Sequence, residues 1–132
     1  MATAYCIQAD VEYRFGTTNL STYLDMDGDA DAAKKTARMT AAIAAVGAEF
    51  EDVLRITQHA TSLPVKDSSG AYPTSVVDWV AWAAGIWVYE ANGVLDTDKE
   101  GTPIHKYTFR KLWCDKVLEE VRTGKRRLDA VI

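Results

Sequence analysis

The chain has 132 residues, 48% of them hydrophobic and 26% charged, a composition typical of one globular domain with a real core and not of a disordered chain. Its net charge of -4 argues against a general nucleic-acid binder, which needs a basic face, although a local basic patch stays open. Two cysteines, Cys6 and Cys114, make no disulfide framework, so we expect a reducing compartment. The first residues lack the basic and apolar segments of a signal peptide, and we expect none.

Two short helices are predicted in the first 25 residues. The first covers Gln8–Phe15 and ends at Gly16, because glycine commonly closes helices. The second starts with Thr18 or Asn19 as its N-cap. The residues that helical spacing turns toward the core are Val11, Phe15, Leu20, Tyr23 and Leu24.

Four aspartates alternate around Gly28 in the stretch from Asp25 to Asp31. Carboxylate oxygens spaced this closely along the chain could bind a calcium ion. The EF-hand loop, however, needs glycine at its sixth and glutamate at its twelfth position, and neither is present when the count starts at Asp25 or Asp27. We favour a turn followed by a helix N-cap, whose carboxylates the helix dipole stabilises, over a calcium site.

The longest predicted helix runs from Asp31 to about Gln58. Its apolar residues step by four and three positions, as in a coiled-coil seam: Met39, Ile43, Val46, Phe50 and Val53. A strip of small residues accompanies the seam and consists of Ala37, Ala41, Ala44 and Ala48. Since small side chains let another helix approach, we expect this strip to contact the tryptophan-rich helix that follows, with Gly47 at a close crossing.

Residues 59–74 break the helical pattern with two prolines and a glycine, and their DSSG stretch is a turn signal. A tiny β-hairpin around this turn would bring Leu63 and Val65 opposite Tyr72. The loop is longer than most connections in compact domains. We therefore interpret it as a mobile segment or an assembly contact.

Ser75–Asn92 is the most apolar predicted helix and carries three of the four tryptophans. A helix that is apolar nearly all round is either buried or membrane-spanning. The uncharged run between Asp78 and Glu90 is well short of the roughly 20 residues that a bilayer needs. We therefore predict a central helix that the other helices surround. Its two apolar rows are Val77, Val80, Ala84 and Trp87, and Trp79, Trp82, Ile86 and Tyr89.

The last predicted helix begins at Thr102-Pro103, since proline is favoured in the first helical turn, and ends at Gly124. Its predicted core stripe is Phe109, Leu112, Trp113, Val117 and Val121. The chain then closes with KRRLDAVI, three basic residues followed by a mostly apolar end. Together these elements predict an all-α domain over residues 1–124, a small bundle of about four to five helices with a long loop, and an extended C-terminal arm over residues 125–132.

The sequence contains no catalytic or metal-binding motif. The two histidines, His59 and His105, have no HExxH spacing, and the glycine motifs of phosphate-binding loops and nucleophile elbows are missing. Cys114 lies in a core-like stretch and is interpreted as a buried, inert thiol. We predict no enzymatic activity, no cofactor and no bound metal.

The basic cluster of Lys125, Arg126 and Arg127 has two interpretations. It either contacts DNA phosphates or an acidic partner, or it stabilises the dipole at the end of the last helix, which we favour. The apolar finish, Val131 and Ile132, favours a binding role, because a free apolar tail usually needs a groove.

The opening stretch AYCIQADVEYRFG resembles the start of small phage proteins of the head–tail connector class, especially the Mu-like prophage branch. The later elements follow in the order of that family over nearly the whole chain. They are an Asp-rich turn, a long helix, a leucine-proline loop at Ser62–Val65, a helix rich in alanine and aromatics, and a last helix that ends near Gly124. The chain departs from the pattern in an insertion-like DSSGAY stretch and a heavier tryptophan load.

The resemblance implies a virion structural protein at the head–tail junction, made in the bacterial host cytoplasm. Such proteins assemble as a ring, commonly of twelve copies, beneath the portal protein, extend the DNA channel and offer a platform for the tail or stopper protein. The loop and the arm would reach neighbouring subunits or the portal, and DNA would pass without specific binding, in keeping with an acidic chain. The expected partner-binding residues are Leu63, Val65, Tyr72, Lys125, Arg126, Arg127, Leu128, Val131 and Ile132. The alternative is a small helical regulatory or DNA-binding module that uses the basic cluster.

Overall fold

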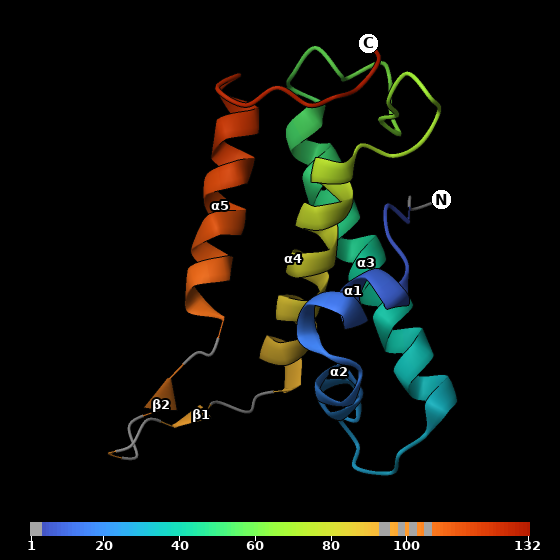
Figure 1. Cartoon of the computed structure of the whole chain (residues 1–132), viewed down its shortest axis with the longest axis vertical. Helices are drawn as coiled ribbons and strands as arrows, with labels where there is room; N and C mark the ends of the chain where they lie inside the picture. Colours follow the sequence, from blue (N-terminus) through green and yellow to red (C-terminus); the bar gives the residue numbers. More distant parts are fainter. Residues whose placement is uncertain (1–3, 93–95, 98–99, 101–102, 105–106) are drawn as a thin grey trace.

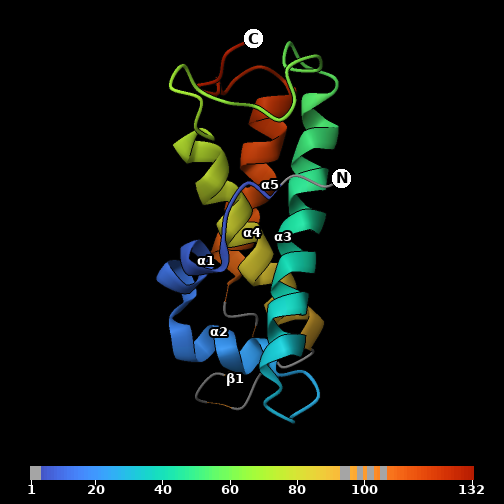
Figure 2. The ribbon, with the colours of Figure 1, turned by 90° about the vertical axis from the view of Figure 1, so that its right-hand side faces the viewer.

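The computed structural model describes residues 4–92, 96–97, 100, 103–104 and 107–132, and over these residues the chain is a bundle of five α-helices with one pair of very short strands. The long helices α3, α4 and α5 follow the long axis of the molecule, and α1 and α2 pack beside one half of α4 (Figures 1 and 2). The predicted all-α class is confirmed. The elements are α1 (Gln8–Phe15), α2 (Thr17–Leu24), α3 (Ala32–Leu54), α4 (Thr74–Asn92), β1 (Asp96–Thr97), β2 (Pro103–Ile104) and α5 (Thr108–Arg122).

Helix α4 is the centre of the bundle, as its composition predicts. It contacts each of the other four described helices, and side chains such as Trp79, Val80 and Ala84 are buried. The closest approach is made by Phe15 of α1 at Gly85, where an added Cβ would lie 2.1 Å from Cε2 of the phenyl ring. No described helix is both long and apolar enough to cross a bilayer.

The two N-terminal helices are confirmed. Helix α1 has the predicted bounds and ends at Gly16, whose φ of +89° lies in the region that favours glycine. Helix α2 begins at Thr17, slightly before the predicted cap. The predicted inward residues are buried except Tyr23, which is half-buried: Val11, Phe15, Leu20 and Leu24.

The seam of α3 is confirmed, but the role predicted for its alanine strip is wrong. The seam faces the core, and its only half-buried member is Val53. Ala44 is half-buried, whereas Ala37, Ala41 and Ala48 are exposed. Each lies two positions from a seam residue, which is about 200° around a helix and therefore on the opposite face. Gly47 is buried, and α3 ends at Leu54, short of the predicted Gln58.

The predicted start and core stripe of the last helix are wrong in part. Pro103 lies in β2 and α5 begins at Thr108, while Thr102 lies outside the described residues. Phe109 is 87% and Leu112 58% exposed, and the buried residues of the helix are Cys114, Val117 and Val121. Helix α5 packs against α3 and α4 only on its inner side, whereas α1 and α2 lie across α4 from it (Figure 1). The outer face of its first turns, with Phe109 and Leu112, therefore lacks a covering neighbour among the described elements.

The tiny β-hairpin predicted in the loop at 59–74 does not form. Asp67 instead closes a turn, in which its backbone N–H donates to the carbonyl oxygen of Ala71 at 2.8 Å. Among the described residues, strand pairing occurs after α4, where Asp96 is opposite Ile104 and Thr97 opposite Pro103 in an antiparallel ribbon.

Candidate functional site

The long loop after α3 and the C-terminal arm meet at the end of the bundle away from β1 and β2 (Figure 1). The backbone N–H of Val131 donates to the carbonyl oxygen of Lys66 at 2.7 Å, which joins the arm to the loop. The side chain of Leu128 is buried, with 9% of its surface exposed. The arm is therefore non-helical, as predicted, but it lies across the end of its own bundle.

The loop is held to the N-terminal segment by two of the residues predicted as partner contacts. Val65 is fully buried, and its backbone N–H donates to the hydroxyl oxygen of Tyr5 at 3.3 Å. The ring of Tyr72 packs edge-on against that of Tyr5, with 4.9 Å between ring centroids. Leu63 is half-buried against the core. In the single chain these residues serve the fold, and burial raises the pKa of the Tyr5 hydroxyl to about 12.

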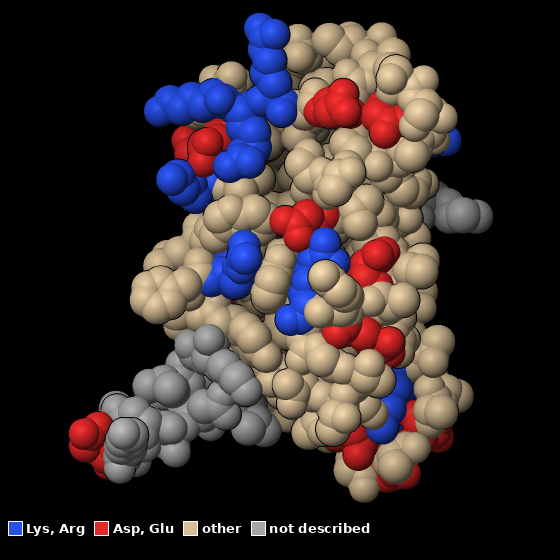
Figure 3. All heavy atoms as spheres, viewed as in Figure 1, with Lys and Arg blue, Asp and Glu red and all other residues tan. Residues whose placement is uncertain are grey.

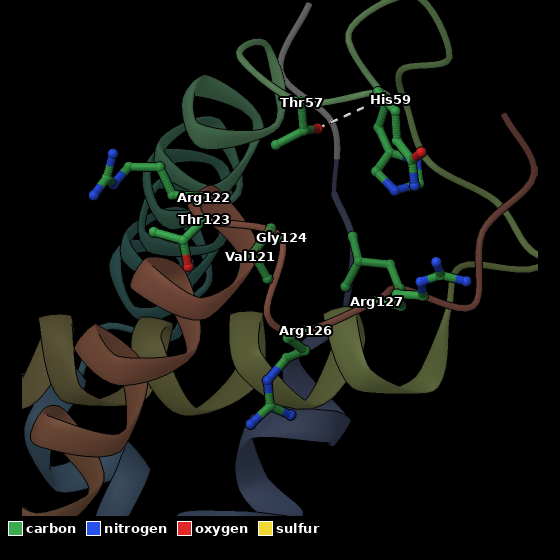
Figure 4. Close-up of a pocket in the computed structure, with 10 residues that line it drawn as sticks. Thr57, His59, Val121, Arg122, Thr123, Gly124, Arg126 and Arg127 are labelled. Atoms are coloured by element: carbon green, nitrogen blue, oxygen red, sulfur yellow. Dashed lines mark hydrogen bonds between the residues drawn. The ribbon is translucent and has the colours of Figure 1, made fainter.

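A pocket of about 360 Å³ opens between the loop and the arm (Figure 4). Residues 57–59 line it from the loop, residues 121–124 from the end of α5, and residues 126–128 from the arm. Three arginines belong to this lining, and none of the lining residues is acidic. The pocket thus joins part of the predicted basic cluster to residues that are far away in the sequence.

The three arginines of the pocket differ in their partners. Arg122 donates from Nε to Glu119 at 2.9 Å, and the guanidinium of Arg126 lies 3.6 Å from the carboxylate of Glu120. Arg127 has no ion pair within the part of the chain that the structure describes. Lys and Arg side chains gather over the C-terminal end of α5 (Figure 3), so this acidic protein has a local basic surface.

His59 is the buried polar residue of the pocket, with 4% of its surface exposed. Its backbone N–H donates to the hydroxyl oxygen of Thr57 at 3.2 Å, whereas its side-chain Nδ1 has no hydrogen-bond partner. Burial holds the pKa of the imidazole below its usual value, so the ring is neutral at pH 7. Sequence reasoning did not assign His59 a place, because only the fold brings it next to the arginines. His105 lies outside the described residues.

A second surface feature, the α5 surface, consists of Phe109 and Leu112, which are neighbours on one face of the helix. Trp87 of α4 is 43% exposed, although Trp79 of the same helix is buried, and the two α5 residues are more exposed still. Beside Trp87 a cleft of about 180 Å³ runs between α3, α4 and α5. Sequence reasoning placed these residues in the core, because a large apolar residue on a helix gives the same pattern whether it faces the core or a partner.

The Asp-rich turn caps α3 as predicted. The carboxylate of Asp31 accepts from the backbone N–H of Lys34 at 3.1 Å. Asp27 pairs with Arg38 at 2.6 Å, and Asp29 pairs with the ammonium of Lys34 at 2.6 Å. Hydrogen bonds from these cations lower the pKa values of both carboxylates. Among the described residues no cluster of acidic, histidine or cysteine side chains is arranged to hold a metal ion.

Cys114 is buried in α5, in agreement with its interpretation as a core thiol. Its carbonyl oxygen accepts from the indole N–H of Trp79 at 2.9 Å, which links α4 to α5. Burial raises the pKa of its thiol to about 12, so the reactive thiolate is scarce at neutral pH.

Comparison with protein-family models, with curated proteins and with solved structures finds no match for this chain.

Proposed function

We propose that this chain is a virion structural protein, a head–tail adaptor of a tailed phage. In this role about twelve copies form a ring under the portal protein, extend the DNA channel and receive the tail or stopper protein. The opening stretch and the order of elements support the proposal, as does the net charge of -4, because a channel that passes DNA should not bind it tightly. The role is structural and needs no catalytic site.

Two separate exposed apolar surfaces on one chain carry this proposal. The first is the α5 surface, and the second is the arm end, where Val131 is 55% and Ile132 68% exposed. The α5 surface lies at the start of α5, whereas the C-terminus lies at the opposite end of the bundle (Figure 1), and the helical rise separates the two ends of α5 by roughly 20 Å. A ring of one chain needs a head-to-tail contact between two different surfaces on each copy. Large exposed apolar residues at two places meet that need.

Native mass spectrometry over a concentration series tests the ring. We expect the unmodified chain to form a closed assembly of about a dozen copies. The double variants Phe109→Ser/Leu112→Ser and Val131→Ser/Ile132→Ser should each abolish the closed assembly while the monomer stays folded by circular dichroism. All four side chains are mostly exposed, so their loss costs the single chain little stability.

Tyr13→Ser is the matched control, since Tyr13 is 89% exposed on α1 and lies outside both apolar surfaces. This variant should assemble like the unmodified chain. If Tyr13→Ser weakens assembly as much as the double variants, the association is nonspecific and hydrophobic, and the two surfaces have no special role. A chain that stays monomeric at every concentration contradicts the self-assembling ring.

A DNA-binding or regulatory module is the second candidate, and the basic surface at the end of α5 favours it. Such a module binds DNA with an affinity that falls steeply as salt concentration rises. A titration of labelled duplex DNA at low salt separates the two functions, because an adaptor that lets DNA pass should show no tight complex.

A further inference from the structure

Three buried side-chain polar atoms without a hydrogen-bond partner belong to residues near the end of the described bundle where the loop and the arm meet. They are Nδ1 of His59, Nε of Arg126 and Oε1 of Glu120. His59 and Arg126 line the pocket under the arm, and Glu120 faces Arg126 at 3.6 Å. Buried polar groups in folded proteins are nearly always hydrogen-bonded. Arg126 and Glu120 face each other, so the side chain of His59 marks the place where polar atoms from outside the chain complete the structure.

The charges around the pocket select an anion. Three arginines and no acidic residue belong to its lining, and in Figure 4 the guanidinium groups of Arg122 and Arg126 point away from His59. Arg122 and Arg126 have glutamate partners on α5, whereas Arg127 has no ion pair among the described residues. In Figure 4, His59 and Arg127 stand on one side of the pocket and Arg122 on the other. An anion bound beside His59 would lie next to Arg127, whose charge is not neutralised by a carboxylate of the described chain.

The positive charge of the lining favours phosphate over carboxylate, because a phosphomonoester carries nearly two negative charges at neutral pH and a carboxylate carries one. Guanidinium groups bind phosphate oxygens through paired N–H donors, and a neutral imidazole adds one further N–H. A carboxylate offers two oxygens in one plane, whereas a phosphomonoester offers three around a tetrahedron. The volume of about 360 Å³ also leaves room for an organic group beside the phosphate. We propose that this pocket binds a small phosphomonoester, with its phosphate between His59 and Arg127.

This site is independent of the ring, because it uses neither the α5 surface nor the exposed arm end. Isothermal titration with phenyl phosphate, and with benzoate as a planar carboxylate of similar size, tests it on the full chain. Phenyl phosphate should bind at least about tenfold more tightly than benzoate, and Arg127→Gln should weaken phenyl phosphate by about tenfold, the usual effect of losing a charged hydrogen-bond donor.

Lys125→Gln is the matched control, since Lys125 is an exposed cation of the same cluster that does not line the pocket. It should change the affinity less than about twofold, as expected for an exposed, solvent-screened charge. In NMR spectra the ring signals of His59, assigned by their loss in His59→Gln, should move as phenyl phosphate is added. Equal weakening by Arg127→Gln and Lys125→Gln, or unmoved His59 signals, would overturn the pocket and leave only a diffuse basic surface. Absence of phenyl phosphate binding in the millimolar range would overturn it as well.

Discussion

The two sides of α4 are packed differently. On one side Phe15 of α1 rests against Gly85 so closely that no Cβ fits there, and Phe50 of α3 packs on Trp79 with ring centroids 5.0 Å apart. On the α5 side Trp87 of α4 is 43% exposed, and Phe109 and Leu112 of α5 stay exposed. One side of the central helix is thus completed within the chain, whereas the other leaves apolar surface that a single copy does not bury. Stability and assembly should therefore depend on different sides of the same helix.

Gly85→Ala should have the largest effect on stability, because it breaks the tightly packed side. The new methyl group would overlap the ring of Phe15, and such overpacking costs about 3 kcal/mol of unfolding free energy, more than the roughly 1 kcal/mol that alanine gains in a helix. Urea unfolding followed by tryptophan fluorescence measures the loss. Phe15→Leu in the same chain should restore part of it by removing ring atoms. A Gly85→Ala protein as stable as the unmodified chain would show that the two helices separate easily.

Trp79→Phe should cost about 2 kcal/mol, because it leaves a cavity and removes the indole donor to the carbonyl of Cys114. Trp87→Phe makes the same chemical change in the same helix, but Trp87 is 43% exposed against 2% for Trp79. It should cost less than about 0.5 kcal/mol. Chemical denaturation of both variants gives the difference directly, and equal losses would contradict the assignment of Trp87 to an open surface.

High pH should lower the stability on both sides by similar amounts. Burial raises the pKa values of the Cys6 and Cys114 thiols from 9.0 to about 12. Between these values the unfolded chain releases thiol protons that the folded chain keeps, so the free energy of unfolding is unaffected below pH 9 and falls as the pH rises toward 12. At pH 10 the loss should be roughly 1 kcal/mol per thiol.

Cys114→Ala should flatten this dependence by the share of one thiol. Denaturation at a series of pH values from neutral to alkaline, compared between the unmodified chain and the variant, measures that share. Parallel curves for the two proteins would show that the Cys114 thiol ionises equally in the folded and unfolded states. Tyr5, whose pKa is also raised to about 12, adds to the alkaline loss in both proteins and does not affect the comparison.

Local signals in the sequence predicted most of the helices. Gly16 ends α1 with a positive φ, and the side chain of Asp31 caps α3. Both features depend only on the identity of a residue and on neighbours a few positions away. The apolar composition of Ser75–Asn92 likewise required a surrounded helix, whatever surrounds it. These features depend on contacts within a few helical turns or on the total apolar content of a segment, so they can be predicted from the sequence alone.

The tertiary structure alone decided which apolar residues are covered and which residues form the pocket. Phe109 and Cys114 both lie on α5, and only the position of α4 and α3 makes one exposed and the other buried. The arm could be recognised as non-helical from its sequence, but its path across the bundle depends on the contact of Val131 with Lys66. His59 and Arg127 line the same pocket because that path brings the end of the chain over the loop. Helical periodicity is a property of short segments. Which apolar residues are covered, and which distant residues line one pocket, depends on how distant segments pack.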